Sequence, residues 1–187
     1  MGLLVALAIC FYLYSIPNEA PEPESTVIVA DAATQPKTLH IPTLELTAPI
    51  IALGIDDTGE FVAPDSGHEV GWYLGGGYPG SNDPAQAVLL SGHLTGPDGQ
   101  PAVFADLDQL QPGEIILIGR EDNTVFSYTV AEIYTMPLPE IDMAALMASA
   151  SSEQEGVTLI TCAGGYDEAQ ATYAQRLIVR AVLENEH

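Results

Sequence analysis

Short apolar runs, separated by proline and glycine turns, dominate the chain from residue 38 onward. They predict strands rather than helices, because several alternate between apolar and polar positions and carry prolines at their edges. The runs expected to form strands cover residues 39–42, 45–51, 87–93, 114–118, 125–134, 157–162 and 176–183. Short helices are expected over residues 103–110 and from the capping residue Asp142 to Ala150. This pattern predicts a mainly β domain that forms a closed or nearly closed barrel.

The first 37 residues differ in composition from this domain. Residues 1–16 are almost wholly apolar and predict an uncleaved transmembrane signal anchor. This segment is longer than the apolar core of a signal peptide and shorter than the about 20 residues that a membrane-spanning helix needs. The alternatives are a cleaved signal peptide, a helix of the protein core and lipidation at Cys10. Residues 17–37 are rich in proline and glutamate, which predicts an extended acidic linker. Residues 38–187 are then the folded domain.

The charge balance excludes several kinds of partner. The chain has 26 Asp and Glu against 4 Lys and Arg, a net charge of -22, so it repels nucleic acid and anionic lipid headgroups. Solubility or a salty habitat explains this acidity, with a calcium site among the acids as the alternative, although no motif supports calcium. Neither a zinc-ligand spacing nor a nucleotide-binding glycine motif occurs. We therefore expect no cofactor and no metal ligands.

Cys162 is the only cysteine outside the first ten residues, so it has no disulfide partner within the predicted domain. It ends an expected strand, and His93 follows another. A histidine in such a place often has only a structural role. A thiol and an imidazole at two strand ends, however, are the nucleophile and the base of a cysteine enzyme.

Two of the three arginines, Arg176 and Arg180, lie in the last expected strand. Alternation along a strand puts both on one face, so the pattern alone does not choose between them. An arginine beside the thiol would lower its pKa or hold an oxyanion, whereas an arginine farther away would pair with one of the many acids. Proximity to the loop after Cys162 favours Arg176 for the first role.

Residues 158–162 read Thr-Leu-Ile-Thr-Cys and match in full the TLxTC signature of the sortases, which are membrane-anchored cysteine transpeptidases. His93 in Ser-Gly-His-Leu and Arg176 at the start of the last strand match the family's other motifs in the same order. The resemblance covers roughly residues 39–183. Within this range, the sequence is similar to both class F and class E sortases. It implies an eight-stranded sortase barrel that the N-terminal helix holds on the outer side of the cell membrane.

The resemblance also implies a mechanism. Cys162 would attack a carbonyl of an LPxTG-like sorting signal and form a thioacyl-enzyme, His93 would exchange the protons, and Arg176 would steady the oxyanion. The acceptor would be an amine of a cell-wall precursor or a pilin. Thr161, Ala163 and Leu94 would contact the substrate, in a groove walled by residues 136–156. Two alternatives are a cysteine peptidase with water as acceptor and a non-catalytic barrel that binds peptide or glycan.

Overall fold

The computed structural model describes residues 31–57 and 61–184. The predicted anchor at 1–16 and most of the predicted linker lie outside these residues. Within them, no helix is both long enough and apolar enough to span a bilayer.

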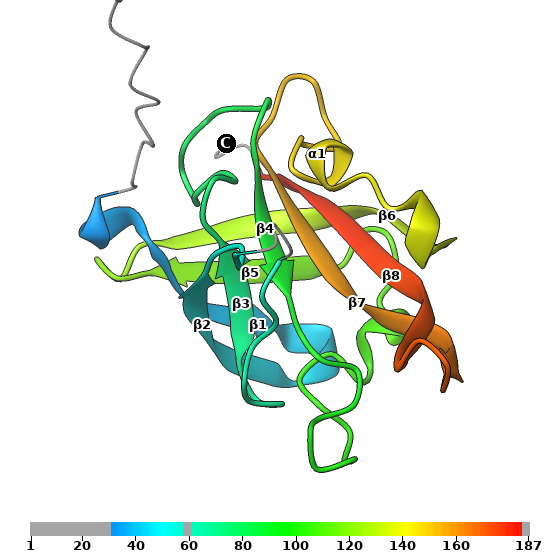
Figure 1. The fold of residues 1–187 in the computed structure, drawn as a ribbon. Helices are drawn as coiled ribbons and strands as arrows, with labels where there is room; N and C mark the ends of the chain where they lie inside the picture. The colour runs from blue at the N-terminus through cyan, green and yellow to red at the C-terminus, as the bar shows by residue number, and fades with distance from the viewer. Residues whose placement is uncertain (1–30, 58–60, 185–187) are drawn as a thin grey trace, which may run out of the picture.

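Eight strands close into a barrel, as the sequence predicts (Figure 1). The strands are β1 (Pro36–Ile41), β2 (Leu46–Leu53), β3 (Val70–Tyr73), β4 (Ala87–Ser91), β5 (Ile115–Arg120), β6 (Val125–Pro137), β7 (Gly156–Asp167) and β8 (Thr172–Leu183). Their order around the barrel is β1-β2-β3-β4-β7-β8-β6-β5. The β2–β3 and β4–β7 pairs are parallel, and the other pairs are antiparallel. The strand β1 begins two residues before the expected domain boundary.

Helical structure is limited to single turns. These are α1 (Met143–Leu146) and the 3-10 turns η1 (Ala32–Thr34), η2 (Pro42–Leu44), η3 (Leu107–Gln109) and η4 (Leu138–Glu140). Asp142 caps α1 as predicted, since its carboxylate accepts hydrogen bonds from the N–H groups of Ala144 and Ala145. The prediction that this helix reaches Ala150 is wrong. It ends early because the next residues bond to the segment before β4, for example from the N–H of Ser149 to the carbonyl of Pro84.

The predicted helix over residues 103–110 is also mostly wrong, because only η3 forms there. The segment instead forms short turns, in which Ala105 donates to the carbonyl of Ala102 at 3.0 Å and Leu107 donates to that of Phe104 at 3.3 Å. The N–H groups of Val103 and Phe104 donate to the carbonyls of Gly67 at 2.7 Å and His93 at 3.0 Å. These two bonds hold the segment against the loops before β3 and after β4.

Two apolar clusters lie on the two faces of β4, β7 and β8. The larger cluster fills the barrel and includes Leu90, Leu159 and Val179. The smaller cluster lies outside the barrel, around Leu89 and Ile160. Ile141, Met143, Leu146 and Met147 of the segment before β7 pack onto this outer cluster. The sheet is therefore buried on both faces here, as Figure 1 shows with α1 above β7 and β8.

Glu155, just before β7, is a carboxylate with only 2% of its surface exposed. It accepts hydrogen bonds from the N–H groups of Gly80 and Asn82, at 2.9 and 2.7 Å, and from the hydroxyls of Ser81 and Tyr128. Burial, followed by the nearby charge of Glu155, raises the pKa of Tyr128 far above its usual range. This buried network holds the loop before β4 against β6 and β7.

Candidate active site

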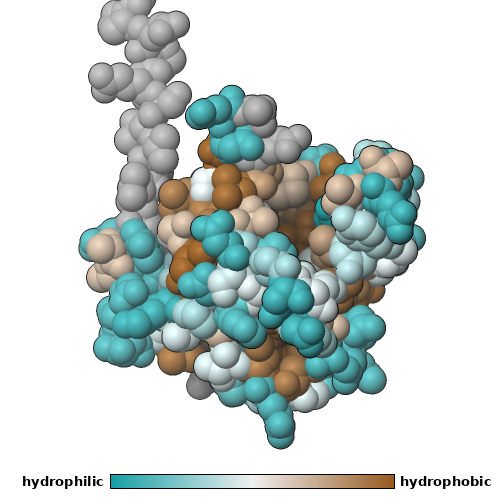
Figure 2. All heavy atoms as spheres, turned by 60° about the horizontal axis from the view of Figure 1, so that its bottom comes forward, coloured by the Kyte–Doolittle hydropathy of each residue, from teal (hydrophilic) through white to brown (hydrophobic). Residues whose placement is uncertain are grey.

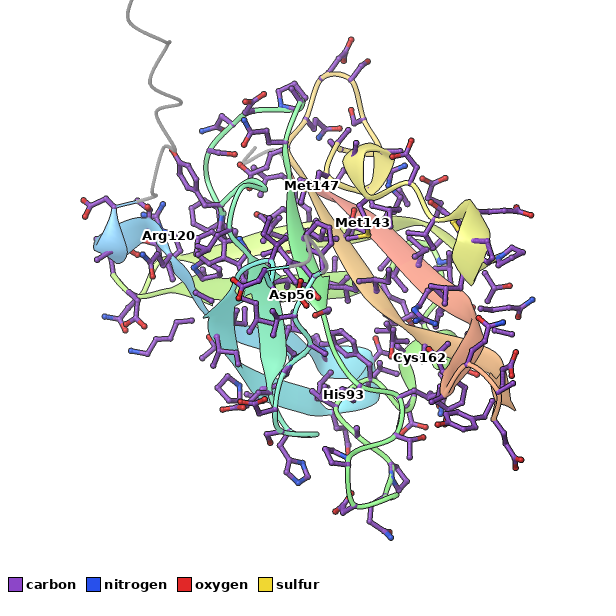
Figure 3. All side chains as sticks on the ribbon, viewed as in Figure 1. Asp56, His93, Arg120, Met143, Met147 and Cys162 are labelled. Atoms are coloured by element: carbon purple, nitrogen blue, oxygen red, sulfur yellow. The ribbon has the colours of Figure 1, made fainter. Side chains whose placement is uncertain are left out.

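One cleft of about 760 Å³ is lined by all three residues that the sequence singles out for catalysis: His93, Cys162 and Arg176. His93 follows the end of β4, Cys162 lies in β7, and Arg176 lies in β8. Because β4 and β7 are adjacent and parallel, their carboxyl ends meet at the same edge of the sheet. Figure 3 shows His93 and Cys162 toward the same end of the barrel.

Cys162 and Arg176 lie directly opposite each other in the β7–β8 pair. The guanidinium Nη1 donates to the carbonyls of Tyr173 and Gln175, both at 2.9 Å, and Nη2 contacts the hydroxyl of Thr172 at 3.3 Å. No carboxylate forms an ion pair with Arg176 in the part of the chain that the structure describes. Its positive charge is therefore uncompensated beside the thiol.

Arg180 has a different environment. It forms an ion pair with Glu132 at 3.1 Å and donates to the carbonyl of Ala148 at 2.7 Å. It lies opposite Thr158, four residues before Cys162 along β7. Arg180 thus ties β6 and β8 to the segment after α1, and Arg176 is the arginine that the structure brings to the thiol.

The thiol of Cys162 is half-buried and free. Burial raises its pKa above the ordinary value, and the charge of Arg176 opposes this rise. Because burial disfavours the thiolate, Cys162 needs a proton acceptor to become a nucleophile.

His93 supplies a suitable ring nitrogen. Its Nε2 lies 2.7 Å from the carbonyl oxygen of Pro64, in the loop between β2 and β3. A carbonyl oxygen only accepts hydrogen bonds, so Nε2 carries a proton. The nitrogen left to exchange a proton is consequently Nδ1, and the loop carbonyl fixes the orientation of the ring.

Thr161 directly precedes Cys162 in β7 and is only 3% exposed. Its hydroxyl donates to the carbonyl of Gly92 at 2.8 Å, and the N–H of Gly92 donates to the carbonyl of Ile160 at 3.2 Å. Gly92 itself is required by packing, because a Cβ there would lie 2.5 Å from the ring of Phe104. Thr161, a predicted substrate contact, also lines the main cleft, and its hydroxyl forms a link between β7 and the residue before His93.

Leu94 and Ala163, the other predicted substrate contacts, do not line the main cleft. They line a second hollow of about 260 Å³, which also reaches Cys162. The three predicted substrate contacts therefore do not line one surface: Thr161 lines the main cleft, whereas Leu94 and Ala163 line the second hollow.

The sequence interpretation missed part of the lining of the main cleft, formed by Phe61, Ala63, Pro64 and Tyr73. The rings of Phe61 and Tyr73 meet edge to face at 4.7 Å, and the hydroxyl of Tyr73 donates to the carbonyl of Val62 at 2.9 Å. No motif marks this loop, and its role follows only from long-range contacts. Among the described residues, no group of three or more His, Cys, Asp or Glu is arranged to hold a metal ion.

A thiol, an imidazole and a guanidinium that line one cleft at the edge of a closed β-barrel are the groups of a cysteine acyl-transferase. A family model of the sortase domain matches residues 39–184. The chain therefore belongs to the sortase family, whose members are cysteine transpeptidases.

Solved sortase structures share the fold. Sortase C-1 from Actinomyces oris matches with a TM-score of 0.60 at 23% identity, over 80% of this chain and 72% of that chain. Sortase A from Corynebacterium diphtheriae, a lid mutant, matches with a TM-score of 0.60 at 20% identity, over 85% and 74% of the two chains. The pilus-related sortase C of Group B Streptococcus matches with a TM-score of 0.58 at 18% identity, over 83% and 70%. A comparison with curated proteins found no match. The similarity to classes F and E stays a prediction.

Proposed function

We propose that this sortase cleaves an LPxTG-like sorting signal and transfers the surface protein to an amine of a cell-wall precursor or a pilin. The observation that carries the proposal is the single cleft that joins Cys162 to His93 and Arg176. The pilus-related name of one structural neighbour agrees with a pilin acceptor. We further propose that residues 1–16 anchor the protein in the cell membrane with the domain outside.

The main cleft suits an extended apolar peptide. The cleft has apolar lining residues, namely Phe61, Tyr73, Ile141, Met143 and Ile160. Such a lining favours the leucine and proline of a sorting signal over charged side chains. Figure 2, which turns the lower end of the molecule in Figure 1 toward the viewer, shows hydrophobic residues exposed in patches between hydrophilic ones.

In the proposed reaction, the sulfur of Cys162 attacks the scissile carbonyl carbon after its proton passes to Nδ1 of His93. Arg176 stabilises the oxyanion that forms. The C–N bond then breaks, and His93 returns the proton to the leaving amine. The products of this half-reaction are a thioacyl-enzyme and the free C-terminal part of the signal.

The test is mass spectrometry of LPxTG-like peptides incubated with the purified full chain, with and without an added primary amine. Wild-type protein should release the C-terminal fragment and join the N-terminal fragment to the amine, and Cys162→Ala should do neither. Normal cleavage by Cys162→Ala would refute the proposal. Cleavage by the wild type with water as the sole acceptor would instead identify a cysteine peptidase.

A further inference from the structure

The joined ends of β7 and β8 extend beyond the strands that flank them in the barrel. The strand β7 pairs with β4 only as far as Ile160, and β8 pairs with β6 only from Gln175 onward. Residues 164–174, here called the hairpin tip, pair only with each other within the described chain and lie at the lower right of Figure 1. The register shifts between Ala163 and Tyr166, an irregularity of the kind that bends a strand. A two-stranded hairpin is only marginally stable by itself, so the position of the tip depends on contacts with other elements.

The hairpin tip forms part of the main cleft. Gln170 and Thr172 line the cleft together with Arg176, which lies at the base of the tip. The guanidinium of Arg176 also has its acceptors there: it donates to the carbonyl of Tyr173 at 2.9 Å and contacts the hydroxyl of Thr172 at 3.3 Å. A movement of the tip would therefore move both a lining of the cleft and the groups that orient Arg176.

One side-chain bond joins the hairpin tip to another part of the site. The hydroxyl of Tyr173 lies 3.0 Å from the hydroxyl of Thr95, in the loop after β4, and the two share a part-buried hydrogen bond. Thr95 is two residues beyond His93. Among the described residues, every other side-chain hydrogen bond of the tip stays within the β7–β8 hairpin. The bond therefore links the loop that carries His93 to the strand end that carries Arg176.

The segments on both sides of this bond have supports of their own. In the loop after β4, Thr95 forms an isolated antiparallel β-bridge with Pro101. In the hairpin, Tyr173 pairs with Tyr166, and the two rings meet edge to face at 5.3 Å. The bond thus connects two ordered segments, and its loss would release one from the other.

We propose that Tyr173 is a positioning residue, whose hydroxyl bonds to Thr95 and docks the hairpin tip against the loop that carries His93. Docking fixes Arg176 and His93 relative to each other and holds the tip side of the cleft in place. This role rests on the proposed reaction, in which the guanidinium and the imidazole act on the same scissile bond.

The first experiment measures docking without a substrate. Amide hydrogen exchange of the full chain is followed by mass spectrometry for the wild type, Tyr173→Phe and Thr95→Val. Each substitution removes one hydroxyl of the pair and keeps most of the side chain. Peptides from the hairpin tip should exchange about two- to tenfold faster in both variants, which is the contribution of one neutral hydrogen bond to an equilibrium. Peptides from β1, which does not pair with β7 or β8, should exchange as in the wild type.

The second experiment measures catalysis, by release of a fluorescent leaving group from an LPxTG-like peptide. Tyr173→Phe should lower kcat about two- to tenfold and change KM little, because the apolar lining at Phe61, Ile141 and Met143 comes from other elements. The double variant with Thr95→Val should lose no more than the more impaired single variant, because both changes remove the same bond. Thr95→Ser keeps a hydroxyl and should retain the kcat of the wild type.

Tyr166→Phe is the matched control. It removes the hydroxyl of the neighbouring ring, whose residue is 56% exposed, and should behave as the wild type in both experiments. The positioning role is refuted by wild-type exchange and kcat in Tyr173→Phe, by additive losses in the double variant, or by an equal loss in Tyr166→Phe. A lower melting temperature of Tyr173→Phe with unchanged kcat would also overturn it, since Tyr173 would then only stabilise the fold.

The two experiments separate this inference from the proposed function. If the wild type releases no fluorescent group, the sorting-signal proposal fails. Hydrogen exchange needs no peptide, so it still decides whether the bond between Tyr173 and Thr95 docks the hairpin tip.

Discussion

The hydrogen bond from Thr161 to Gly92 is the contact that most directly couples the two halves of the catalytic pair. Thr161 precedes the nucleophile, Gly92 precedes the histidine, and the bond is 2.8 Å long and buried. Thr161→Val keeps the shape of the side chain but removes the donor. The carbonyl of Gly92 would then lose its partner in a buried environment, which costs about 1–3 kcal/mol of free energy of unfolding.

This cost sets the size of the expected effects. For a domain of this length, each kcal/mol lowers the melting temperature by about 2–4 °C, so a fall of several degrees should appear in a thermal melt. The rate of acylation should fall further, by about tenfold to a hundredfold, because a shift of about 1 Å between reacting groups has effects of that order. A positioning role predicts that kcat falls while KM changes little.

Thr161→Ser is the matched control, since it keeps the hydroxyl and loses only a methyl group. It should retain most of the acylation rate, measured by release of a fluorescent leaving group from an LPxTG-like peptide. If Thr161→Val raises KM with unchanged kcat and unchanged stability, the original prediction of substrate contact is right and the positioning argument is refuted. Equal impairment of the Ser and Val variants would also refute it.

Three further predictions concern charged and buried groups. Arg176→Gln should raise the pKa of Cys162, because it removes the charge that opposes burial; the pH profile of alkylation by iodoacetamide should move to higher pH, while Arg180→Gln should leave it unchanged. Glu155→Ala should lower the free energy of unfolding in urea by about 2–4 kcal/mol, since it leaves buried donors unpaired; a loss below 0.5 kcal/mol would contradict the network. The raised pKa of Tyr128 predicts stability that is complete below pH 10.0, its ordinary pKa, and falls as pH rises above it, because only the unfolded tyrosine ionises; Tyr128→Phe should reduce this alkaline loss, and an identical loss would refute the assignment.

The sequence predicted the barrel well where strands alternate or end at proline and glycine. It missed β3, in which all four residues are buried, because a strand buried on both faces shows no alternation. The last two strands were predicted too short. The end of β7 and the start of β8 are polar and lack an apolar pattern, and they are strands because they pair with each other. Both misses arise from pairing between strands, which a single-sequence pattern does not contain.

The candidate site was predicted only in part, because some of its contacts also depend on pairing between distant segments. The residue types of His93 and Cys162 suggested chemistry by themselves. Strand alternation did not separate Arg176 from Arg180, and proximity to the loop after Cys162 favoured Arg176, which the register of β8 on β7 places opposite Cys162. The bond from His93 to Pro64 and the wall at Phe61 depend on a loop without regular structure. Glu155 looked like one more acid in an acidic chain, and only its burial distinguishes it.

Topology explains why these distant residues meet. The strands β4 and β7 are neighbours in the barrel although β5 and β6 lie between them in sequence, and Ser91 pairs with Ile160 in their parallel register. Two residues beyond each of these positions lie His93 and Cys162, so the parallel pair alone brings both to one edge. The strand β8 runs antiparallel to β7 and therefore contributes its early residue, Arg176, to that edge. A shift of one residue in the register of β7 would turn the Cys162 side chain into the barrel, where it could not act as a nucleophile. The hydrogen bond from Thr161 to Gly92, one residue before Cys162, opposes that shift.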